Sequence, residues 1–440
     1  MRAKVLEKRI MILRILVCLF FVIGIGLSFK VWHTDRLFPV LPVFDWMPSS
    51  TDDISGFLAV ILVFGLLLGT VIRSRKYFIG LFVLLIFLLL QDQMRWQPWV
   101  YIYVAFLFPF ALWKKVDESL LPYFQFLLIG IYLWSGAFKF GGSFIELTWD
   151  KMLRTLLYID DSSTRQSLHF LGYGIPIMEI LIAIGLFFKK SRHVAILFAV
   201  ITHIIILIYV ITNQQNSVIY PWNFAMIFLV VLCFYEAGNS MVDWVHLDSA
   251  RCATSDSARC ATSDSLQLAQ GGAARRAQNK QLESNTSSNQ DSSNIAEQQS
   301  SAVGNKVKLQ IASGALFFLL LPALNPLGLW DNYLSFHLYS GTNGAFCVGL
   351  DQDQYKKIDP ELYEYFWAVD EPNGKFWIYV NLWALEELNV AFYPEERTFK
   401  ELAKSFCGGD IPSEKLEFVI YRDGFKRKGA TIFECECITQ

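Results

Sequence analysis

Three ionisable side chains lie in apolar surroundings. Lys139 ends the segment YLWSGAFKF, Glu179 lies near the middle of a long apolar run, and His203 lies near the middle of the next run. A charge in hydrocarbon costs several kcal/mol on most scales, so such groups indicate a function or a partner. A desolvated lysine can act as a base, and a carboxylate–imidazole pair can bind a head group or move protons. We therefore treat Lys139, Glu179 and His203 as candidate catalytic residues.

Each candidate also has an interpretation without chemistry. Glu179 and His203 are predicted at similar depths on two antiparallel helices, where a hydrogen-bonded pair would lock the helices together. A lysine at a helix end commonly extends to the membrane surface as an anchor. Lys139, however, is on the side that the positive-inside rule depletes of cations. The small residues Ser135 and Gly136, one turn earlier, would let another helix or a ligand approach.

Two polar and aromatic clusters are candidates for ligand binding. The first is QDQMRWQPWVYIY (91–103), and the second is YPWNF (220–224). Tryptophan and tyrosine are enriched at membrane interfaces, which is the alternative explanation for both clusters. That explanation does not account for an aspartate or an asparagine. The candidate ligand-binding residues are Asp92, Arg95, Trp96, Trp99 and Asn223.

The elements that position these residues are predicted to be membrane helices. Of the 440 residues 54% are hydrophobic, which is high for a soluble protein, and the net charge of −2 gives no reason to expect nucleic-acid binding. A spanning helix needs roughly 20 mostly apolar residues. About nine candidate spans follow, at 10–31, 54–73, 77–91, 97–113, 119–138, 169–188, 194–212, 217–236 and 308–329. The third and fourth are short enough to form one hairpin that dips into the bilayer.

Lysine and arginine alternate between the loops in a way that predicts the orientation. The cations that fall on the predicted cytoplasmic side are Arg2, Lys4, Lys8, Arg9, Arg73, Arg75, Lys76, Lys114, Lys115, Lys189, Lys190 and Arg192. The N-terminus is therefore predicted in the cytoplasm, and nine spans place the C-terminal region outside. The first apolar run lacks a small-residue cleavage site, so we expect it to be a span and not a signal peptide.

The sequence predicts an all-α polytopic bundle with a small α+β or β-rich C-terminal domain. Helices 1–8 occupy 1–246, a disordered cytoplasmic loop follows at 247–305, helix 9 lies at 306–330, and the outer domain spans 331–440. The loop is rich in Ser, Gln and Asn and contains the tandem copy ARCATSDS-ARCATSDS. The spacing of Cys252 and Cys260 does not match a zinc site, so no metal is expected.

The outer domain contains segments with strand and helix patterns. FWIYVNLW (376–383) and KLEFVIYRD (415–423) are predicted strands, and TFKELAKSF (398–406) is a predicted helix. In an oxidising compartment we expect Cys347 or Cys407 to pair with Cys435 or Cys437, although free thiols remain an alternative.

Four segments together resemble the vitamin K-dependent γ-carboxylase-like proteins and the related horizontally transferred transmembrane (HTTM) domains. LLLQDQMRWQPWVYIY (88–103) resembles the pattern Asp-x-x-x-Trp-Asn-Asn-His-x-Tyr-x-Tyr, and YLWSGAFKF (132–140) resembles Tyr-x-x-Ala-Gly-x-x-Lys-Leu. VITHIIIL (200–207) is similar to a segment with Phe-His. NYLSFHLYSGT (332–342) resembles Trp-Ser-x-x-x-His. The four occur in the family's order, over roughly residues 8–345.

The resemblance implies that Lys139 is a base that deprotonates a reduced quinone, whose reaction with oxygen drives carboxylation of a protein glutamate. This sequence departs from the family at the position of the family's histidine, which is Trp99 here. An indole cannot replace the histidine as an acid or a base. A second departure is the size of the outer region, about 110 residues. Both departures argue against full γ-glutamyl carboxylation but are compatible with a quinone site.

The resemblance implies a bacterial inner membrane, and two hypotheses follow for this multi-pass protein. In the first, the bundle binds a quinone or lipid near Lys139, Asp92 and Trp99 and performs redox or carboxylase-like chemistry. In the second, it is a non-enzymatic scaffold or small-molecule binder, like DoxX-like membrane components, that presents the periplasmic domain to a protein partner. The expected partners are thus the lipid bilayer, a quinone or lipid ligand, and a protein that binds the outer domain.

Overall fold

A computed structural model gives the architecture of the chain. It describes residues 2–44, 46–47, 52–113, 120–214, 216–235, 309, 312–341, 344–368, 375–407, 412, 415–421, 430–433 and 435. The predicted loop at 247–305, with Cys252 and Cys260, lies outside the described residues, as do Lys114, Lys115 and Cys437.

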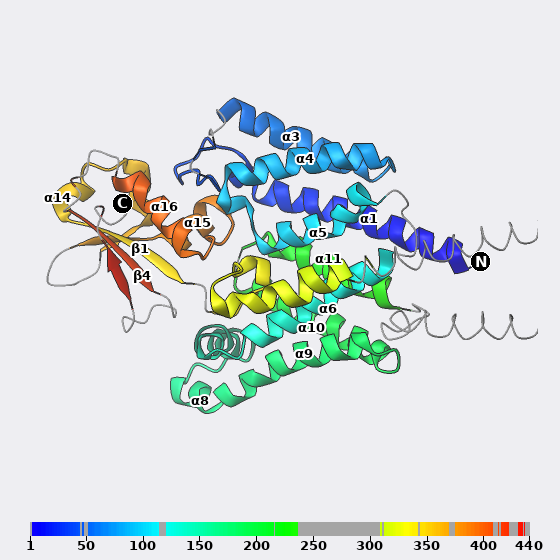
Figure 1. The fold of residues 1–440 in the computed structure, drawn as a ribbon. Helices are drawn as coiled ribbons and strands as arrows, with labels where there is room; N and C mark the ends of the chain where they lie inside the picture. The colour runs from blue at the N-terminus through cyan, green and yellow to red at the C-terminus, as the bar shows by residue number, and fades with distance from the viewer. Residues whose placement is uncertain are drawn as a thin grey trace, which may run out of the picture.

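A bundle of helices lies beside a small sheet domain (Figure 1). The bundle helices are α1 (Arg2–Leu27), α2 (Phe29–Trp32), α3 (Asp52–Gly69), α4 (Arg75–Gln91), α5 (Pro98–Leu112), α6 (Leu121–Phe138), α9 (Gly174–Phe187), α10 (Arg192–Thr212) and α11 (Ile219–Phe234). The π-helix η5 (Leu316–Leu320) and the 3-10 helix η6 (Leu321–Leu327) lead to the sheet domain. A short 3-10 turn, η1 (Gln93–Arg95), joins α4 to α5.

Four helices are long and apolar enough to cross a membrane, by length and composition: Glu7–Leu27, Leu121–Phe138, His169–Phe187 and Arg192–Thr212. Shorter apolar helices span Ile54–Gly69, Pro98–Leu112, Ile219–Phe234 and Ala312–Leu327. Within the described ranges the helical, membrane-compatible architecture is thus confirmed, whereas nine full-length spans are not.

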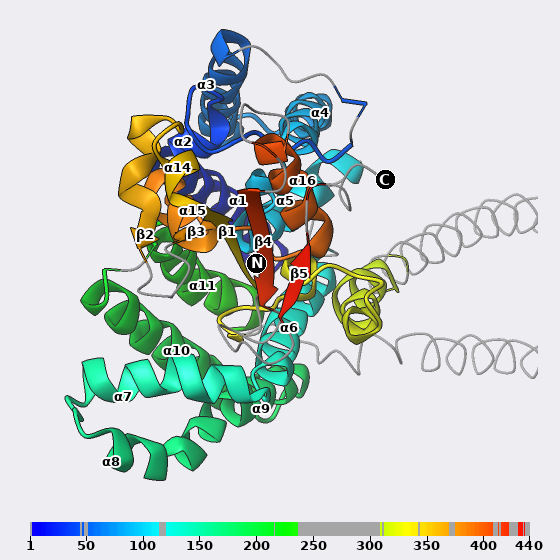
Figure 2. The ribbon, with the colours of Figure 1, turned by 90° about the vertical axis from the view of Figure 1, so that its left-hand side faces the viewer.

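Short helices form a layer at the end of the bundle that also carries the sheet domain (Figures 1 and 2). They are the π-helix η3 (Phe144–Trp149), α7 (Asp150–Leu156), α8 (Ser162–Ser167) and the 3-10 helix η4 (His169–Tyr173). Asp150 holds the layer together, because its carboxylate accepts hydrogen bonds from Arg165 Nε at 3.0 Å and pairs with His169 Nε2 at 3.2 Å. This layer connects α6 to α9.

The C-terminal domain is α+β, which is one of the two predicted alternatives. Its antiparallel sheet has the order β2-β3-β1-β4-β5, with β1 at Ala345–Leu350, β2 at Phe366–Ala368, β3 at Phe376–Tyr379, β4 at Leu416–Tyr421 and β5 at Thr431–Phe433. Its helices are η7 (Tyr333–Ser335), α14 (Gln352–Tyr355), η8 (Pro360–Tyr365), α15 (Val380–Leu388) and α16 (Glu396–Cys407). The predicted strand 376–383 is correct only as far as Tyr379, since the residues after it begin α15.

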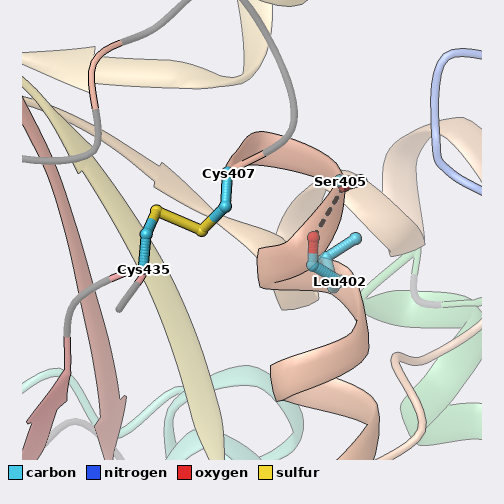
Figure 3. Close-up of a disulfide and its surroundings, with 4 residues drawn as sticks. All are labelled: Leu402, Ser405, Cys407 and Cys435. Carbon is cyan, nitrogen blue, oxygen red and sulfur yellow. Dashed lines mark hydrogen bonds between the residues drawn. A yellow bond between two sulfur atoms is a disulfide. The ribbon is translucent and has the colours of Figure 1, made fainter. Parts of the chain in front are cut away.

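A disulfide joins the end of α16 to the chain just after β5 (Figure 3). It pairs Cys407 with Cys435, whose Cα atoms are 5.6 Å apart, so one of the expected pairings is present. Cys347 is a buried free thiol in β1. The bond fixes the C-terminal strand against the helix that covers the sheet.

The sheet domain is hydrogen-bonded to the end of the bundle through α15. The Glu387 carboxylate accepts hydrogen bonds from the backbone N–H groups of Leu37 (2.7 Å) and Phe38 (3.0 Å). Asn389 Nδ2, just after α15, donates to the carbonyl of Leu27 at the end of α1. The domain therefore lies at the end of α1 that is opposite to the N-terminus.

Candidate functional site

Close packing of α6 on α9 creates the charged part of the site. A Cβ atom on Gly136 would lie 2.9 Å from the carbonyl oxygen of Pro176 and 3.0 Å from the Cβ of Glu179. Glycine is therefore required for this approach, which brings α9 to the small residues that the sequence singled out on α6. Lys139 follows α6 by one residue and Glu179 lies in α9, so the contact brings their side chains together.

Lys139 and Glu179 form a buried ion pair. The Lys139 Nζ atom lies 2.7 and 2.9 Å from the two carboxylate oxygens of Glu179, and it donates to Ser135 Oγ at 2.5 Å and to the Ser135 carbonyl at 3.2 Å. Both ionisable residues are only 4% exposed. The ammonium group thus points into the bundle, where a surface anchor would point outward.

A second polar group is a hydrogen-bonded chain across α6, α10 and α11. His203 Nδ1 lies 2.8 Å from Asn223 Oδ1, and His203 Nε2 lies 2.8 Å from the Tyr132 hydroxyl. Asn223 Nδ2 donates to the carbonyl of Ile219, so its Oδ1 is left to accept from His203 Nδ1. A neutral imidazole then accepts at Nε2 from Tyr132, and this orders the chain as Tyr132, His203, Asn223.

Both groups border one cavity of about 260 Å³. Tyr132, Ser135, Lys139, Glu179, His203 and Asn223 supply its polar lining. Most of the remaining wall is apolar, with side chains from α9 and α10 and with Phe144 and Met152 from the short helices that follow α6. Leu338 and Tyr339, from the segment that leads to the sheet, complete it. An apolar cavity with a few convergent polar groups is the usual form of a small-molecule site.

Four of the predicted site residues are therefore in one place: Lys139, Glu179, His203 and Asn223. The predicted contact between Glu179 and His203 is replaced by two others. Glu179 pairs with Lys139, and His203 bonds to Tyr132 and Asn223. Sequence reasoning missed Tyr132, although it lies in the same segment as Lys139. The only signal was its position seven residues before the lysine, which is two helical turns.

Asp92 and Arg95 belong to a separate buried network. Asp92 Oδ2 lies 2.6 Å from Arg36 Nη2, and Asp92 Oδ1 accepts from the backbone N–H of Met94. Arg95 donates to the carbonyls of Val31 (3.0 Å) and Leu88 (2.8 Å). Neither residue borders the Lys139 cavity. Their contacts connect the segments at the end of α1 that is opposite to the N-terminus, where α4 ends and α5 begins.

Trp96 and Trp99 also pack away from the cavity. The indole N–H of Trp96 donates to the carbonyl of Leu89. A Cβ atom on Gly24 would lie 2.7 Å from the Trp99 ring, so this ring fills the space beside α1. The Trp99 ring packs against the ring of Tyr103, which contacts Trp222 in the cavity wall. The two predicted clusters therefore meet at Tyr103 and Trp222, but the four predicted ligand residues of the first cluster do not border the cavity.

Among the described residues, no group of three or more His, Cys, Asp or Glu side chains could hold a metal ion. Comparison of the chain with protein-family models, with curated proteins and with solved structures gives no match. The fold and the site define a mainly helical protein with a buried Lys–Glu pair beside an apolar cavity.

Proposed function

We propose that the chain spans a bacterial inner membrane about nine times, with the N-terminus in the cytoplasm and the C-terminal domain in the periplasm. With a cytoplasmic N-terminus, the helices that end before Arg73 and Lys189 run from the periplasm to the cytoplasm, so both exposed cations lie on the cytoplasmic side, as the positive-inside rule favours. The sheet domain contacts Leu27, at the opposite end of α1. The Cys407–Cys435 disulfide supports an oxidising compartment for this domain.

We further propose that the protein binds a quinone or a lipid-like amphiphile in the Lys139 cavity. One observation carries this proposal: a buried ion pair and a histidine chain both border the same mostly apolar cavity. A flat apolar ring can pack against such walls while polar side chains contact its oxygens. A quinone would supply redox chemistry there.

The residues of the site can bind and exchange protons with such a ligand. The Lys139 ammonium can donate a hydrogen bond to a carbonyl or phenolate oxygen, and Glu179 can take up the proton that the lysine releases. The Tyr132–His203–Asn223 chain offers a second route for a proton, because the imidazole bonds on both sides. This arrangement supports a quinone-dependent oxidoreductase or a carboxylase-like enzyme, with Lys139 as the proton-transfer group.

Native mass spectrometry with lipid extraction tests the proposal. The detergent-purified wild type should carry a quinone or another amphiphile that is lost in Lys139→Ala. Lys139→Arg should keep the ligand if only charge matters, but it should abolish any turnover that needs proton transfer, because guanidinium stays protonated. Lys189→Ala, in an exposed turn, is the control. An equal ligand content in all four proteins would refute the assignment of the site.

A second function is favoured by the contacts of the sheet domain. Glu387, Asn389 and the carbonyl of Ala391 bond to three segments of the bundle, which fixes the orientation of the domain. In this alternative the bundle is a scaffold that presents the domain to a protein partner, and the Lys139–Glu179 pair only locks α6 to α9. Absence of any bound ligand, with normal domain packing, would favour it.

A further inference from the structure

A second charged cavity lies at the end of the bundle opposite to the sheet domain, where α1 begins and α3 turns into α4 (Figure 1). Its volume is about 90 Å³. Three arginines border it: Arg14 from α1, Arg73 from the turn and Arg75 from the start of α4. This volume is several times the roughly 10–15 Å³ that a cavity needs to hold one water, so the cavity has room for a group larger than a single water.

Arg14 is the buried member of this group. It is 4% exposed, and it donates to the carbonyls of Ile72 at 3.0 Å and Thr70 at 3.1 Å, just after the end of α3. These two bonds fix the guanidinium group in place. Its Nε atom is buried and has no hydrogen-bond partner within the described part of the chain. An unmet N–H of a buried cation beside a cavity favours an acceptor from outside the protein.

Within the described ranges, the other two arginines donate to neutral acceptors. Arg73 Nη2 lies 2.9 Å from the sulfur of Met11, and Arg75 Nε donates to the carbonyl of Ala111 at 3.0 Å. As far as the chain is described, no carboxylate forms an ion pair with any of the three guanidinium groups. Among the described residues that border the cavity, Glu7 is the one acid, so these residues bring three positive charges and one negative charge.

The remaining wall is apolar and aromatic. Phe78, Phe110 and Trp113 line it, together with Ile10 and Met11 from α1. Arg14 lies over the Phe78 ring, with its Cζ atom 5.9 Å from the ring centre. A ligand that suits both parts of the wall carries an anionic oxygen group next to an apolar segment.

We propose that this cavity binds the phosphate group of an anionic lipid in the leaflet at the N-terminal end. Guanidinium groups match phosphate oxygens in geometry and charge, and clustered cations at the cytoplasmic surface attract anionic lipids. The apolar wall favours a lipid over free phosphate, because it can contact the glycerol and acyl segments. The site is independent of the Lys139 cavity and of the function proposed for it.

The test compares lipid binding by two charge-matched variants of the full chain. Arg73→Gln/Arg75→Gln removes two exposed cations from the cavity, and Lys189→Gln/Lys190→Gln removes two exposed cations elsewhere in the cytoplasmic loops. Native mass spectrometry in dodecylmaltoside measures the affinity for phosphatidylglycerol, with zwitterionic phosphatidylcholine as the reference lipid. A thermal shift with inorganic phosphate tests whether the free anion is sufficient.

We expect the arginine variant to bind phosphatidylglycerol at least tenfold more weakly than the wild type, while the lysine variant and phosphatidylcholine binding are unchanged. A shift with inorganic phosphate that only the arginine variant loses, without selective lipid binding, would assign the site to the free anion. Equal lipid and phosphate responses in all three proteins would overturn the proposal. An equal loss in both variants would also overturn it, because the effect would then reflect overall charge.

Discussion

The ion pair between Lys139 and Glu179 can be tested by a double-mutant cycle. The two side chains are 5% and 6% exposed, with 2.7 Å between the closest nitrogen and oxygen. Removal of one partner from a buried pair leaves an uncompensated charge and costs about 3–5 kcal/mol. Replacement of both partners by apolar side chains of similar volume is often nearly neutral.

We therefore expect Lys139→Met and Glu179→Leu each to lower the free energy of unfolding by about 3 kcal/mol or more, and the double variant to recover most of this loss. Two single losses of about 3 kcal/mol and a nearly neutral double variant correspond to a coupling energy of about 4 kcal/mol or larger. The assay is equilibrium unfolding in mixed detergent micelles, followed by tryptophan fluorescence. The single variant Lys139→Met should also lose the ligand proposed for the cavity.

The exposed pair Lys400–Glu396 is the matched control. Its side chains are 48% and 46% exposed, and it lies at i,i+4 spacing on α16. Such pairs contribute about 0.3–0.5 kcal/mol, so its cycle should give a coupling energy close to zero. A Lys139–Glu179 coupling below about 1 kcal/mol would contradict the buried ion pair, since it is no larger than the value for exposed pairs.

Three further perturbations test other parts of the structure. Burial raises the pKa of Glu395 to about 7, so the folded domain holds a proton that the unfolded chain releases near pH 4.5. The melting temperature should therefore fall as the pH rises from 4.5 to 7, and Glu395→Gln should remove this pH dependence. Replacement of Cys407 and Cys435 by serine removes the cross-link between two residues that are 28 positions apart. Loop-closure entropy predicts that the free energy of unfolding falls by about 3–4 kcal/mol, and an unchanged melting temperature would contradict a stabilising disulfide. Gly136→Ala should cost about 1–3 kcal/mol by overpacking and weaken ligand binding, while Gly26→Ala, which meets nothing within 4 Å, should leave both properties intact.

Much of the architecture was predictable because membrane helices must be apolar over a long run. The four helices that are long and apolar enough to cross a membrane fall within or close to predicted spans, and the C-terminal domain has its sheet and helix where the alternating and helical patterns indicated. The strand predicted at 376–383 was half wrong, since FWIYVNLW is apolar except for Asn381 and a short, mostly apolar run does not distinguish strand from helix. Tyr379 marks the change from β3 to α15.

The sequence by itself determined which polar residues cost free energy to bury, since Lys139, Glu179 and His203 lie in apolar segments whatever their partners are. Only the tertiary structure decided the pairs. Glu179 faces Lys139 because Gly136 lets α9 approach α6, and such an approach depends on the packing of distant segments. Packing also decides the partner of Asp92. The segment around Asp92 is as polar and aromatic as the segment around Asn223, yet Asp92 pairs with Arg36 and does not border the cavity. Burial cost is a property of a single segment, whereas the partner that offsets it is a property of the whole fold.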